Sequence, residues 1–557
     1  MNLCHDPDGI RAVLSALDRP CYVTRSGHRV GVTAQAPAPG DTVLAAVGPL
    51  PPDRLGSAAF RDHHGVRAAY MAGAMAGGIA GTELVTAMAR AGYLAAFGSA
   101  GLPGPRLDEA LRTLAHRLGD APYACNLIHS PMAPHAERAC VDLCLRHGVR
   151  CVEASAFLTL TPDLVRYRAS GLRPGPAGGV LVHHRVIAKV SRPQVAELFL
   201  RPAPEPLLTE LVARREITAE QARLARAVPM ADDLTVEADS GGHTDRRPLT
   251  VLLPAITRLR DRIARETSAH RPPRPPVRVG AAGSLGTPHA VAAAFALGAD
   301  YVVTGSVNQA AVEAATSPAV KSLLADAGLA DCTMAPAADM FEQGITVQVL
   351  NRGTLFPGRA GRLYRLYRDY GSLEELPAKE RRSLEERIFG RPLDEVWADT
   401  RDYLAAHHAD RLPRAERDAK HRMALTFRWY LAMASRWAVA GDTARSGDWQ
   451  IWCGPAMGAF NAWAAGSTLE PVENRHVTAI AEHLLRGAAH LTRVHHLRTG
   501  GTQLPASCAD YRPPRLSPAA RSARRDAPGP AAPPLRIPGP HRAAELGVTG
   551  RTSPGTT

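Results

Sequence analysis

The chain has 557 residues, of which 45% are hydrophobic and 21% are charged, a balance typical of globular proteins. No run approaches the roughly 18 apolar residues that a transmembrane helix needs, and the first residues lack the basic and apolar regions of a secretory signal. Nine cysteines without such a signal favour reduced thiols over disulfides. We therefore expect a cytoplasmic protein with no membrane partner.

The formal net charge of +13 does not predict a nucleic-acid partner, because much of it lies near the C-terminus. From Gly501 onward, eight arginines stand against three acidic residues, so this segment alone carries a net charge of +5. The segment is rich in Pro, Ala and Gly and has few aromatic rings that could stack on bases. We expect residues 501–557 to form a disordered, Pro/Arg-rich tail.

Residues 1–60 contain short apolar pieces at 21–24 and 42–47, bounded by several prolines. Short apolar runs between proline and glycine punctuation are typical of strands. This pattern predicts a small N-terminal lead-in element that packs on the next domain of the chain.

Beyond residue 60, an apolar strand, a glycine turn and a helix recur in sequence. Eight such strands alternating with helices predict an α/β fold, a (β/α)8 TIM barrel within residues 61–371, because parallel strands need helical crossovers. A doubly wound open sheet is the alternative. The barrel is favoured because polar or glycine residues follow nearly every strand, where barrels place their sites. The predicted strands are 67–71, 93–97, 123–128, 151–154, 186–190, 234–238, 277–282 and 301–304.

The apolar spacing becomes helical after the eighth strand. We expect residues 308–371 to be a helical segment that flanks the barrel, and residues 372–500 to form a helical C-terminal subdomain. Apolar residues at helical spacing between 477 and 491 form a stripe that we interpret as helix packing.

Three cysteines lie close together in the sequence. Cys140 and Cys144 are spaced as neighbours on one helix face, and Cys151 begins a predicted strand. We interpret them as buried core thiols. The paired histidines at 183–184, 407–408 and 495–496 have no carboxylate or cysteine at ligand spacing, so we predict no metal site.

The sixth predicted strand runs directly into Gly241, Gly242 and His243. Two glycines allow a backbone to approach a ligand closely, and the imidazole adds a group that titrates near neutral pH. Alone, the segment is equally compatible with a glycine turn and a surface histidine. In its place among eight strands, it predicts a site with His243 as the catalytic residue.

Gly283 follows the seventh strand, and Gly305 with Ser306 follows the eighth. In a barrel these two loops commonly bind phosphate, which would leave a flavin mononucleotide (FMN) across the barrel mouth. Lys189 within the fifth strand is a costly charge unless an electron-rich group meets it. For the flavin ring, the sequence predicts contacts from Met71, Gly73, Asn126, Lys189, Gly241 and Gly242.

Several segments resemble the trans-acting enoyl reductases of polyketide and polyunsaturated fatty acid synthases, a group within the FMN-dependent nitronate monooxygenase superfamily. The resemblance spans about residues 42–498 and departs from the family pattern at two positions. Gly81 stands where a serine is expected, and Arg246 stands where asparagine is usual. The segments that carry the resemblance are 70–80, 237–245, 305–309, 334–342, 348–350, 353–357 and 454–463.

The resemblance implies NADPH-dependent reduction of the α,β double bond of an acyl thioester on an acyl carrier protein. FMN would pass hydride from NADPH to that double bond. His243 would supply the proton or orient the thioester oxygen, Lys189 would tune the flavin, and the acyl carrier protein would be the partner. A homo-oligomer is left open. The alternatives are a nitronate monooxygenase, with His243 as a base at the same FMN site, and a non-catalytic barrel scaffold within a synthase assembly.

Overall fold

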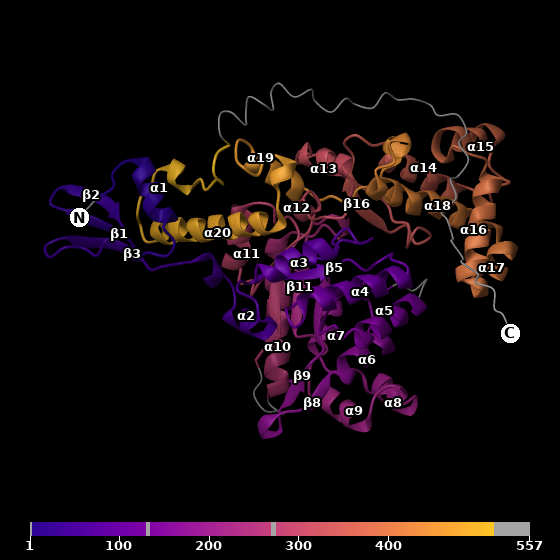
Figure 1. Cartoon of the computed structure of the whole chain (residues 1–557), viewed down its shortest axis with the longest axis horizontal. Coiled ribbons are helices and arrows are strands. Elements are labelled where there is room, and N and C mark those ends of the chain that lie inside the picture. Colours follow the sequence, from indigo (N-terminus) through magenta and orange to yellow (C-terminus); the bar gives the residue numbers. More distant parts are fainter. Residues whose placement is uncertain (1–2, 130–133, 269–274, 517–557) are drawn as a thin grey trace, which may run out of the picture.

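The structure is a computed structural model that describes residues 3–129, 134–268 and 275–516, so most of the predicted tail, residues 517–557, lies outside the described residues. The barrel occupies the lower centre of Figure 1, a row of helices lies above it, and the N-terminal sheet extends to one side. The long helix α20 (Val477–Thr499) runs between the N-terminal sheet and the barrel.

Eight parallel strands close into a barrel, which confirms the predicted fold and excludes the open sheet. The barrel closes where β14 pairs with β4, with Val302 opposite Tyr70. The first predicted strand begins three residues later than expected, and the others agree within about one residue. In chain order the barrel strands are β4 (Tyr70–Ala72), β5 (Leu94–Phe97), β6 (Ala124–Ile128), β7 (Cys151–Ser155), β10 (Arg185–Val190), β11 (Asp233–Glu237), β13 (Arg278–Ala282) and β14 (Val302–Thr304).

Amphipathic helices cover the outside of the barrel. In α4, for example, Leu107, Leu111, Leu114 and Leu118 share one buried stripe, and Gly119 ends the helix. The surrounding elements are α3 (Thr82–Arg90), α4 (Gly104–Leu118), α5 (Pro134–Arg146), α6 (Pro162–Ser170), β8 (Leu172–Pro174), β9 (Val180–Val182), α7 (Pro193–Leu200), α8 (Glu205–Ala213), α9 (Ala219–Ala225), α10 (Leu249–Ser268), α11 (Pro288–Ala296) and α12 (Ser306–Gln309).

Helix α2 (Ala58–His64) closes the N-terminal end of the barrel. The ring of Phe60 stacks on Tyr301 inside the barrel, with centroids 4.3 Å apart. The fully buried carboxylate of Asp233 lies 2.8 Å from His64 Nε2 and also accepts from the Arg278 guanidinium at 2.5 and 3.0 Å. The barrel floor therefore depends on one buried carboxylate with two cationic or polar partners.

The N-terminal residues form α1 (Pro7–Ser15) and a three-stranded antiparallel sheet of β1 (Cys21–Ser26), β2 (Arg29–Thr33) and β3 (Thr42–Val47). This lobe packs on α20 and on η7 (Ala506–Ala509), far along the chain. The buried guanidinium of Arg493 on α20 donates to the carbonyls of Leu14, Ala16 and Gly48 at 3.0–3.1 Å.

The expectation that residues 308–371 are helical is wrong for part of that segment. Strands β15 (Cys332–Pro336) and β16 (Thr346–Leu350) form an antiparallel hairpin there, flanked by α13 (Pro318–Ala325) and α14 (Phe356–Asp369). The two-residue strand β12 (Gly242–His243) pairs with β16 and completes a three-stranded sheet. Residues 347–350 of β16 are all buried, and so short a run does not separate a strand from a helix in sequence.

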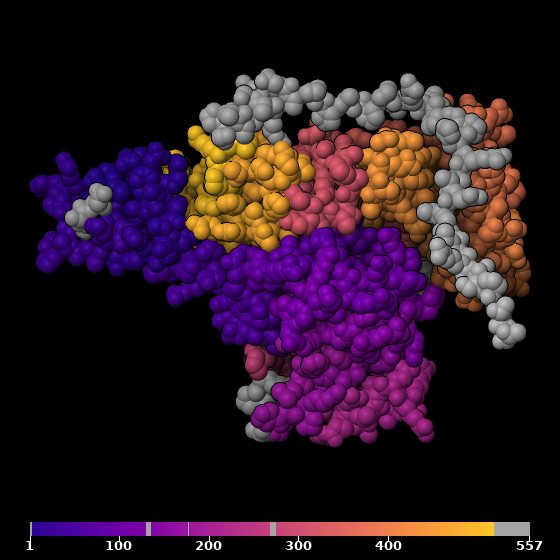
Figure 2. Space-filling view, viewed as in Figure 1, coloured from indigo at the N-terminus to yellow at the C-terminus, as the bar shows by residue number. Residues whose placement is uncertain are grey.

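The remaining residues are mostly helical, and those up to residue 448 form a lobe beside the hairpin that Figure 2 shows above the barrel. Aromatic side chains from α14, α18 and η3 build its core around Phe341, Phe427 and Tyr430. No helix in the described part of the chain is long and apolar enough to cross a bilayer. The elements are α15 (Ala378–Leu384), η3 (Glu385–Phe389), α16 (Leu393–His407), η4 (Ala409–Arg411), α17 (Leu412–Arg417), α18 (Ala419–Ala440), η5 (Thr443–Asp448), α19 (Ala456–Ala464) and η6 (Val472–Asn474).

The barrel floor gives a test of stability. Asp233→Asn leaves the buried His64 and the partly buried Arg278 without their anion, and we expect a loss of about 3–5 kcal/mol, measured from the urea midpoint. Asp120→Asn is the matched control, because its carboxylate pairs with Arg150 while 88% exposed, and we expect a change within about 0.5 kcal/mol. Equal midpoints for the two variants would contradict the account of the floor.

Candidate functional site

The C-terminal ends of the barrel strands bring the predicted residues to one mouth. Strand register aligns Met71 with Val303, Asn126 with Glu153, and Lys189 with Thr235. The glycine loop 241–242 and the loops that begin at Gly283 and Gly305 follow β11, β13 and β14 at the same end. Residues far apart in sequence thus meet because parallel strands end together.

Lys189 lies between two carboxylates in this mouth. Its ammonium is 3.0 Å from Glu237 Oε1, and Glu153 on β7 adds a second negative charge. Burial lowers the pKa of Lys189, but the two glutamates outweigh burial and hold its pKa above the ordinary value. Lys189 is therefore a cation throughout the physiological range.

Glu153 is fully buried and only partly satisfied. Its Oε2 accepts from the Ala74 backbone N–H at 3.2 Å, whereas its Oε1 has no partner among the described residues. Burial raises the pKa of Glu153, and Lys189 opposes that shift. A buried acceptor without a donor is costly, so the mouth is suited to a ligand that brings an N–H or O–H to this depth.

Sequence reasoning missed Glu153 and Glu237, although the signal was available. Each is a charged residue within or at the end of an apolar strand, the same feature that identified Lys189. A buried lysine without a partner would carry an unpaired charge, which is unfavourable. Carboxylates are therefore expected near Lys189.

Asn126 is placed in the wall of the mouth rather than at its rim. Its side-chain NH₂ donates to the Glu153 carbonyl at 3.1 Å and to Ser155 Oγ at 2.9 Å. Both side-chain amide hydrogens thus join β6 to β7. The side-chain oxygen Oδ1 of Asn126 is then the group that a ligand could reach.

Glycines make room where other residues would not fit. A Cβ at Gly73 would lie 2.9 Å from Val303 Cγ1, and one at Gly283 would lie 2.7 Å from the Ala238 carbonyl carbon, with φ at +91°. A Cβ at Gly241 would lie 3.0 Å from the Cys453 carbonyl carbon, whereas Gly305 faces open space. Gly73 is buried, whereas Gly241, Gly283 and Gly305 are partly exposed and leave backbone accessible in the mouth, as a flat ring or a phosphate requires.

The loop that begins at Gly454 joins the site from outside the barrel. The Gly454 N–H donates to Ser306 Oγ at 3.1 Å, so the Ser306 hydroxyl keeps its own hydrogen for another acceptor. Gln348 on β16 donates from Nε2 to Asp239 Oδ1 at 3.2 Å and to the Ser240 carbonyl at 3.0 Å. The glycine loop after β11 is therefore fixed from above by two segments that follow the barrel in sequence.

His243 lies on β12, opposite Val347 of β16. Its Nε2 is 3.2 Å from Oδ1 of Asp339, which the sequence analysis did not select. Burial lowers the pKa of His243, but the hydrogen bond and charge of Asp339 outweigh burial and raise the pKa above its ordinary value. The site therefore presents an imidazole that tends toward its protonated form.

The two departures from the family pattern have local structural settings. Gly81 is the N-cap of α3 and offers no side-chain acceptor to the first turn, which a serine would do. Arg246 is exposed and has φ at +50°, with its backbone N–H donating to Thr244 Oγ1 at 3.0 Å. Asparagine adopts this left-handed region more readily than arginine.

The chemistry of these groups fits an FMN site. The open backbone at Gly305 and the hydroxyl of Ser306 suit a phosphate, and Lys189 suits an electron-rich ring edge. The unpartnered Oε1 of Glu153 suits the imide N–H of a flavin. Met71 is fully buried in the barrel interior, so its contact with the flavin stays a prediction.

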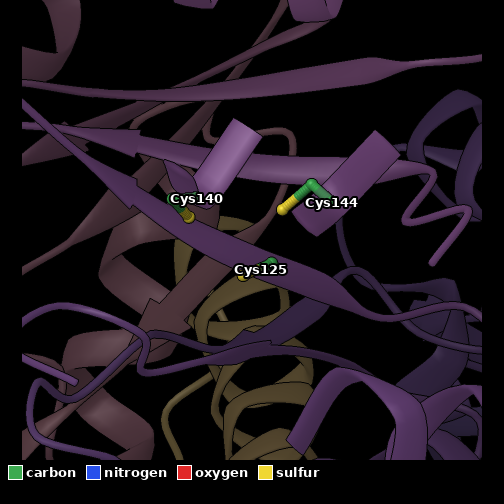
Figure 3. A group of neighbouring side chains, drawn as sticks. All are labelled: Cys125, Cys140 and Cys144. Carbon is green, nitrogen blue, oxygen red and sulfur yellow. The ribbon is translucent and has the colours of Figure 1, made fainter. Parts of the chain in front are cut away.

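Three thiols form a separate cluster outside the barrel mouth. Figure 3 shows Cys140 and Cys144 reaching from α5 toward β6, which carries Cys125. The three sulfur atoms lie within 4.8 Å of one another, and the thiols of Cys125 and Cys140 contact the Asn126 carbonyl at 3.6 and 3.7 Å. Cys151, which the sequence analysis grouped with this pair, packs inside the barrel instead. The cluster is buried and apolar, as core thiols are, and their freedom from metal stays a prediction.

Comparison with known proteins gives matches along most of the chain. Residues 2–49 match the N-terminal domain of the fatty acid synthase subunit PfaD, and residues 370–449 match the inserted helical domain of [acyl-carrier-protein] S-malonyltransferase. The enoyl reductase domain of MlnA from Bacillus amyloliquefaciens superposes with a TM-score of 0.76 at 38% identity, covering 80% of this chain and 99% of that one.

Curated relatives include larger synthase proteins. A polyunsaturated fatty acid synthase subunit of Thraustochytrium is 49% identical over 80% of this chain, which is 30% of its own length. Polyketide biosynthesis protein PksE of Bacillus subtilis is 47% identical over 78% of this chain, which is 56% of its own length. The chain thus spans about a third to just over half of the curated relatives named here.

The backbone at Arg246 leads to a second test. Arg246→Asn should raise the free energy of unfolding by about 1 kcal/mol, because asparagine tolerates the left-handed conformation better. Thermal unfolding measures the change, and Arg247→Asn is the control, since that exposed neighbour has no positive φ. A gain of equal size in both variants would point to charge, not backbone strain.

Proposed function

The chain belongs to the PfaD-like enoyl reductases, within the nitronate monooxygenase-like barrel fold, and we propose that it reduces the α,β double bond of an enoyl thioester held on an acyl carrier protein. The proposal includes NADPH as reductant and FMN as bound cofactor. The proposal rests on the mouth of the barrel, where the Lys189 cation, the buried Glu153 acceptor and the glycine backbone lie near His243.

Bound FMN supplies hydride transfer, from NADPH to the β-carbon of the substrate. His243 supplies the matching proton: its imidazolium gives one hydrogen to the α-carbon and becomes neutral, so hydride and proton together saturate the double bond. The raised pKa of His243 favours the protonated form that this step consumes. Before protonation, the same N–H can donate to the thioester oxygen and hold the substrate in place.

The other predicted residues have binding roles in this proposal. Lys189 places a positive charge beside the flavin ring, where reduction adds electron density. Asn126 offers its side-chain oxygen Oδ1 to the ring edge, and the Glu153 carboxylate accepts a hydrogen bond from the ring imide. The backbone contacts come from Met71, Gly73, Gly241 and Gly242, and the phosphate contacts come from Gly283, Gly305 and Ser306.

The acyl carrier protein is proposed as the partner on the basis of the relatives and of charge. PksE and the Thraustochytrium protein are named as parts of polyketide and fatty acid biosynthesis. Carrier proteins are acidic, and the chain keeps a net positive charge after the +5 of the tail is removed from the total of +13. Such charge raises the rate of encounter with an acidic partner.

One experiment tests the function. The protein is purified, its visible spectrum is examined for flavin, and NADPH oxidation is followed without oxygen on a crotonyl carrier protein. We expect a bound flavin that NADPH bleaches and the enoyl thioester recolours. Oxygen uptake with an alkyl nitronate and no need for NADPH would instead establish a nitronate monooxygenase, and the absence of flavin would leave a scaffold.

His243→Gln tests the proton donor. We expect kcat for the enoyl substrate to fall by about 100-fold or more, because a general acid contributes roughly that much, while flavin content and bleaching by NADPH stay near wild type. His289→Gln, an exposed histidine on α11, is the control and should leave kcat unchanged. Unchanged turnover in His243→Gln would remove His243 from the mechanism.

Lys189→Met tests the cofactor contact. Removal of the cation leaves Glu153 and Glu237 facing an electron-rich ring without compensation, and we expect FMN to bind at least about tenfold more weakly. Equilibrium dialysis of the flavin measures this directly, with the exposed Lys379→Met as control. Wild-type flavin affinity in Lys189→Met would rule out the assigned contact.

A further inference from the structure

Asp339 lies outside the barrel, in the loop 337–345 that connects β15 to β16. Its carboxylate reaches back to the rim and meets His243 at 3.2 Å, joining the barrel's own site to a hairpin that follows the barrel in sequence. Catalytic groups of a barrel are ordinarily set by the loops of the barrel itself. Here the nearest charged partner of the histidine comes from elsewhere.

The helical lobe fixes both sides of Asp339. Arg428 on α18 donates from Nε to the Ala338 carbonyl at 2.7 Å, one residue before Asp339. Its Nη1 also lies 3.4 Å from Glu342 Oε2, three residues after Asp339. His421, about two turns before Arg428 on the same face of α18, contacts the other oxygen of Glu342 at 2.7 Å.

Packing holds the same loop from below. The ring of Phe341 is fully buried, with its centroid 5.5 Å from Tyr364 and 6.4 Å from Phe427 in edge-on arrangements. The loop is also closed by its own backbone, since Ala337 donates to the Ile345 carbonyl at 2.9 Å. Asp339 therefore stands on a segment with little freedom to move, even though its own side chain is 38% exposed.

The pair also decides which ring nitrogen of His243 is available. An ionised carboxylate has no hydrogen to give, so the Nε2 that faces Asp339 carries the hydrogen. In the described residues Nδ1 makes no hydrogen bond with protein, so it is the nitrogen that can exchange a proton with a ligand. A carboxylate that fixes the tautomer and stabilises the imidazolium is the role of an orienting residue in acid–base catalysis.

We propose that Asp339 is the positioning residue of His243, and that α18 holds Asp339 in place through Arg428. The catalytic meaning of this assignment rests on the proposed function, whereas the contact itself does not. The helical lobe thereby becomes part of the acid–base machinery of the barrel.

Other charges near the pair affect the expected pH dependence. Glu237 also raises the pKa of His243, and Lys189 lowers it. On the other side, His243 and Arg428 both favour the ionised form of Asp339, against the effect of burial. Asp339 makes the only direct hydrogen bond to the imidazole within the described residues. Removal of its carboxylate should therefore change the pKa of His243 more than removal of Glu237 or Lys189 would.

The test begins with Asp339→Asn. We expect kcat to fall roughly 10- to 100-fold, because a misplaced group loses about that much, with flavin content unchanged. The alkaline limb of the kcat–pH profile should move to lower pH, since the imidazolium loses the anion that favours it. Asp339→Glu should restore part of both effects, which a merely structural role would not give.

NMR of histidine-labelled protein follows the same proton without catalysis. The His243 ring signal, identified by its loss in His243→Gln, should titrate with a lower midpoint in Asp339→Asn, with or without flavin. An unchanged midpoint would overturn the assignment of Asp339. If the midpoint moves but the wild-type protein reduces no enoyl thioester, the positioning contact stands and the proposed function fails.

Arg428→Met tests the part played by α18. It should lower the midpoint and kcat in the same direction as Asp339→Asn, and it should add nothing to kcat loss in the double variant, because both act through one contact. Arg422→Met is the matched control, since that arginine is on the same helix and pairs with exposed Glu374. A lower melting temperature in Arg428→Met with an unchanged midpoint would overturn the role of α18.

Discussion

The ammonium of Lys189, held between Glu153 and Glu237, is the interaction on which the barrel mouth depends. A fully buried carboxylate such as Glu153 is tolerated only beside a cation, and the lysine in turn keeps its charge because of the two glutamates. The three residues come from β7, β10 and β11, so their meeting requires strands that run parallel and neighbour one another. The charge state of the mouth therefore depends on the parallel pairing of β7, β10 and β11.

The site is composite, because residues beyond the barrel complete it. β16 pairs with the glycine strand β12, Gln348 fixes the loop after β11, and Gly454 bonds to Ser306. The barrel strands form the base and sides of the site, and the hairpin with the helical lobe covers it. This division explains why the described part of the chain continues well past the eighth strand: a barrel alone would leave His243 on a two-residue strand without a partner.

The sequence predicts the barrel well because each strand is a short apolar run followed by a polar or glycine turn, a signal that is local. It selects Lys189 and His243 as candidate site residues for the same reason. It does not predict the hairpin at 332–350, since strands this short show no clear period, and it does not predict the pairing of that hairpin with β12, which lies about a hundred residues away. Asp339 was missed because an acidic residue in a loop carries no mark of function until its neighbour is known. The sequence also does not show that α20 and η7 cover the N-terminal sheet, because the contacting residues lie far apart in the chain.

That sheet has a consequence for the order in which the chain acquires its structure. The contact from Arg493 to the Leu14 carbonyl spans 479 residues, and the apolar face that it helps to cover is translated long before α20. At typical elongation rates of about 5–20 residues per second, roughly 25 to 95 seconds separate the two partners on the ribosome. During that interval Val23, Val32 and their neighbours lack α20, so this sheet reaches its native environment only after the barrel that follows it has been translated.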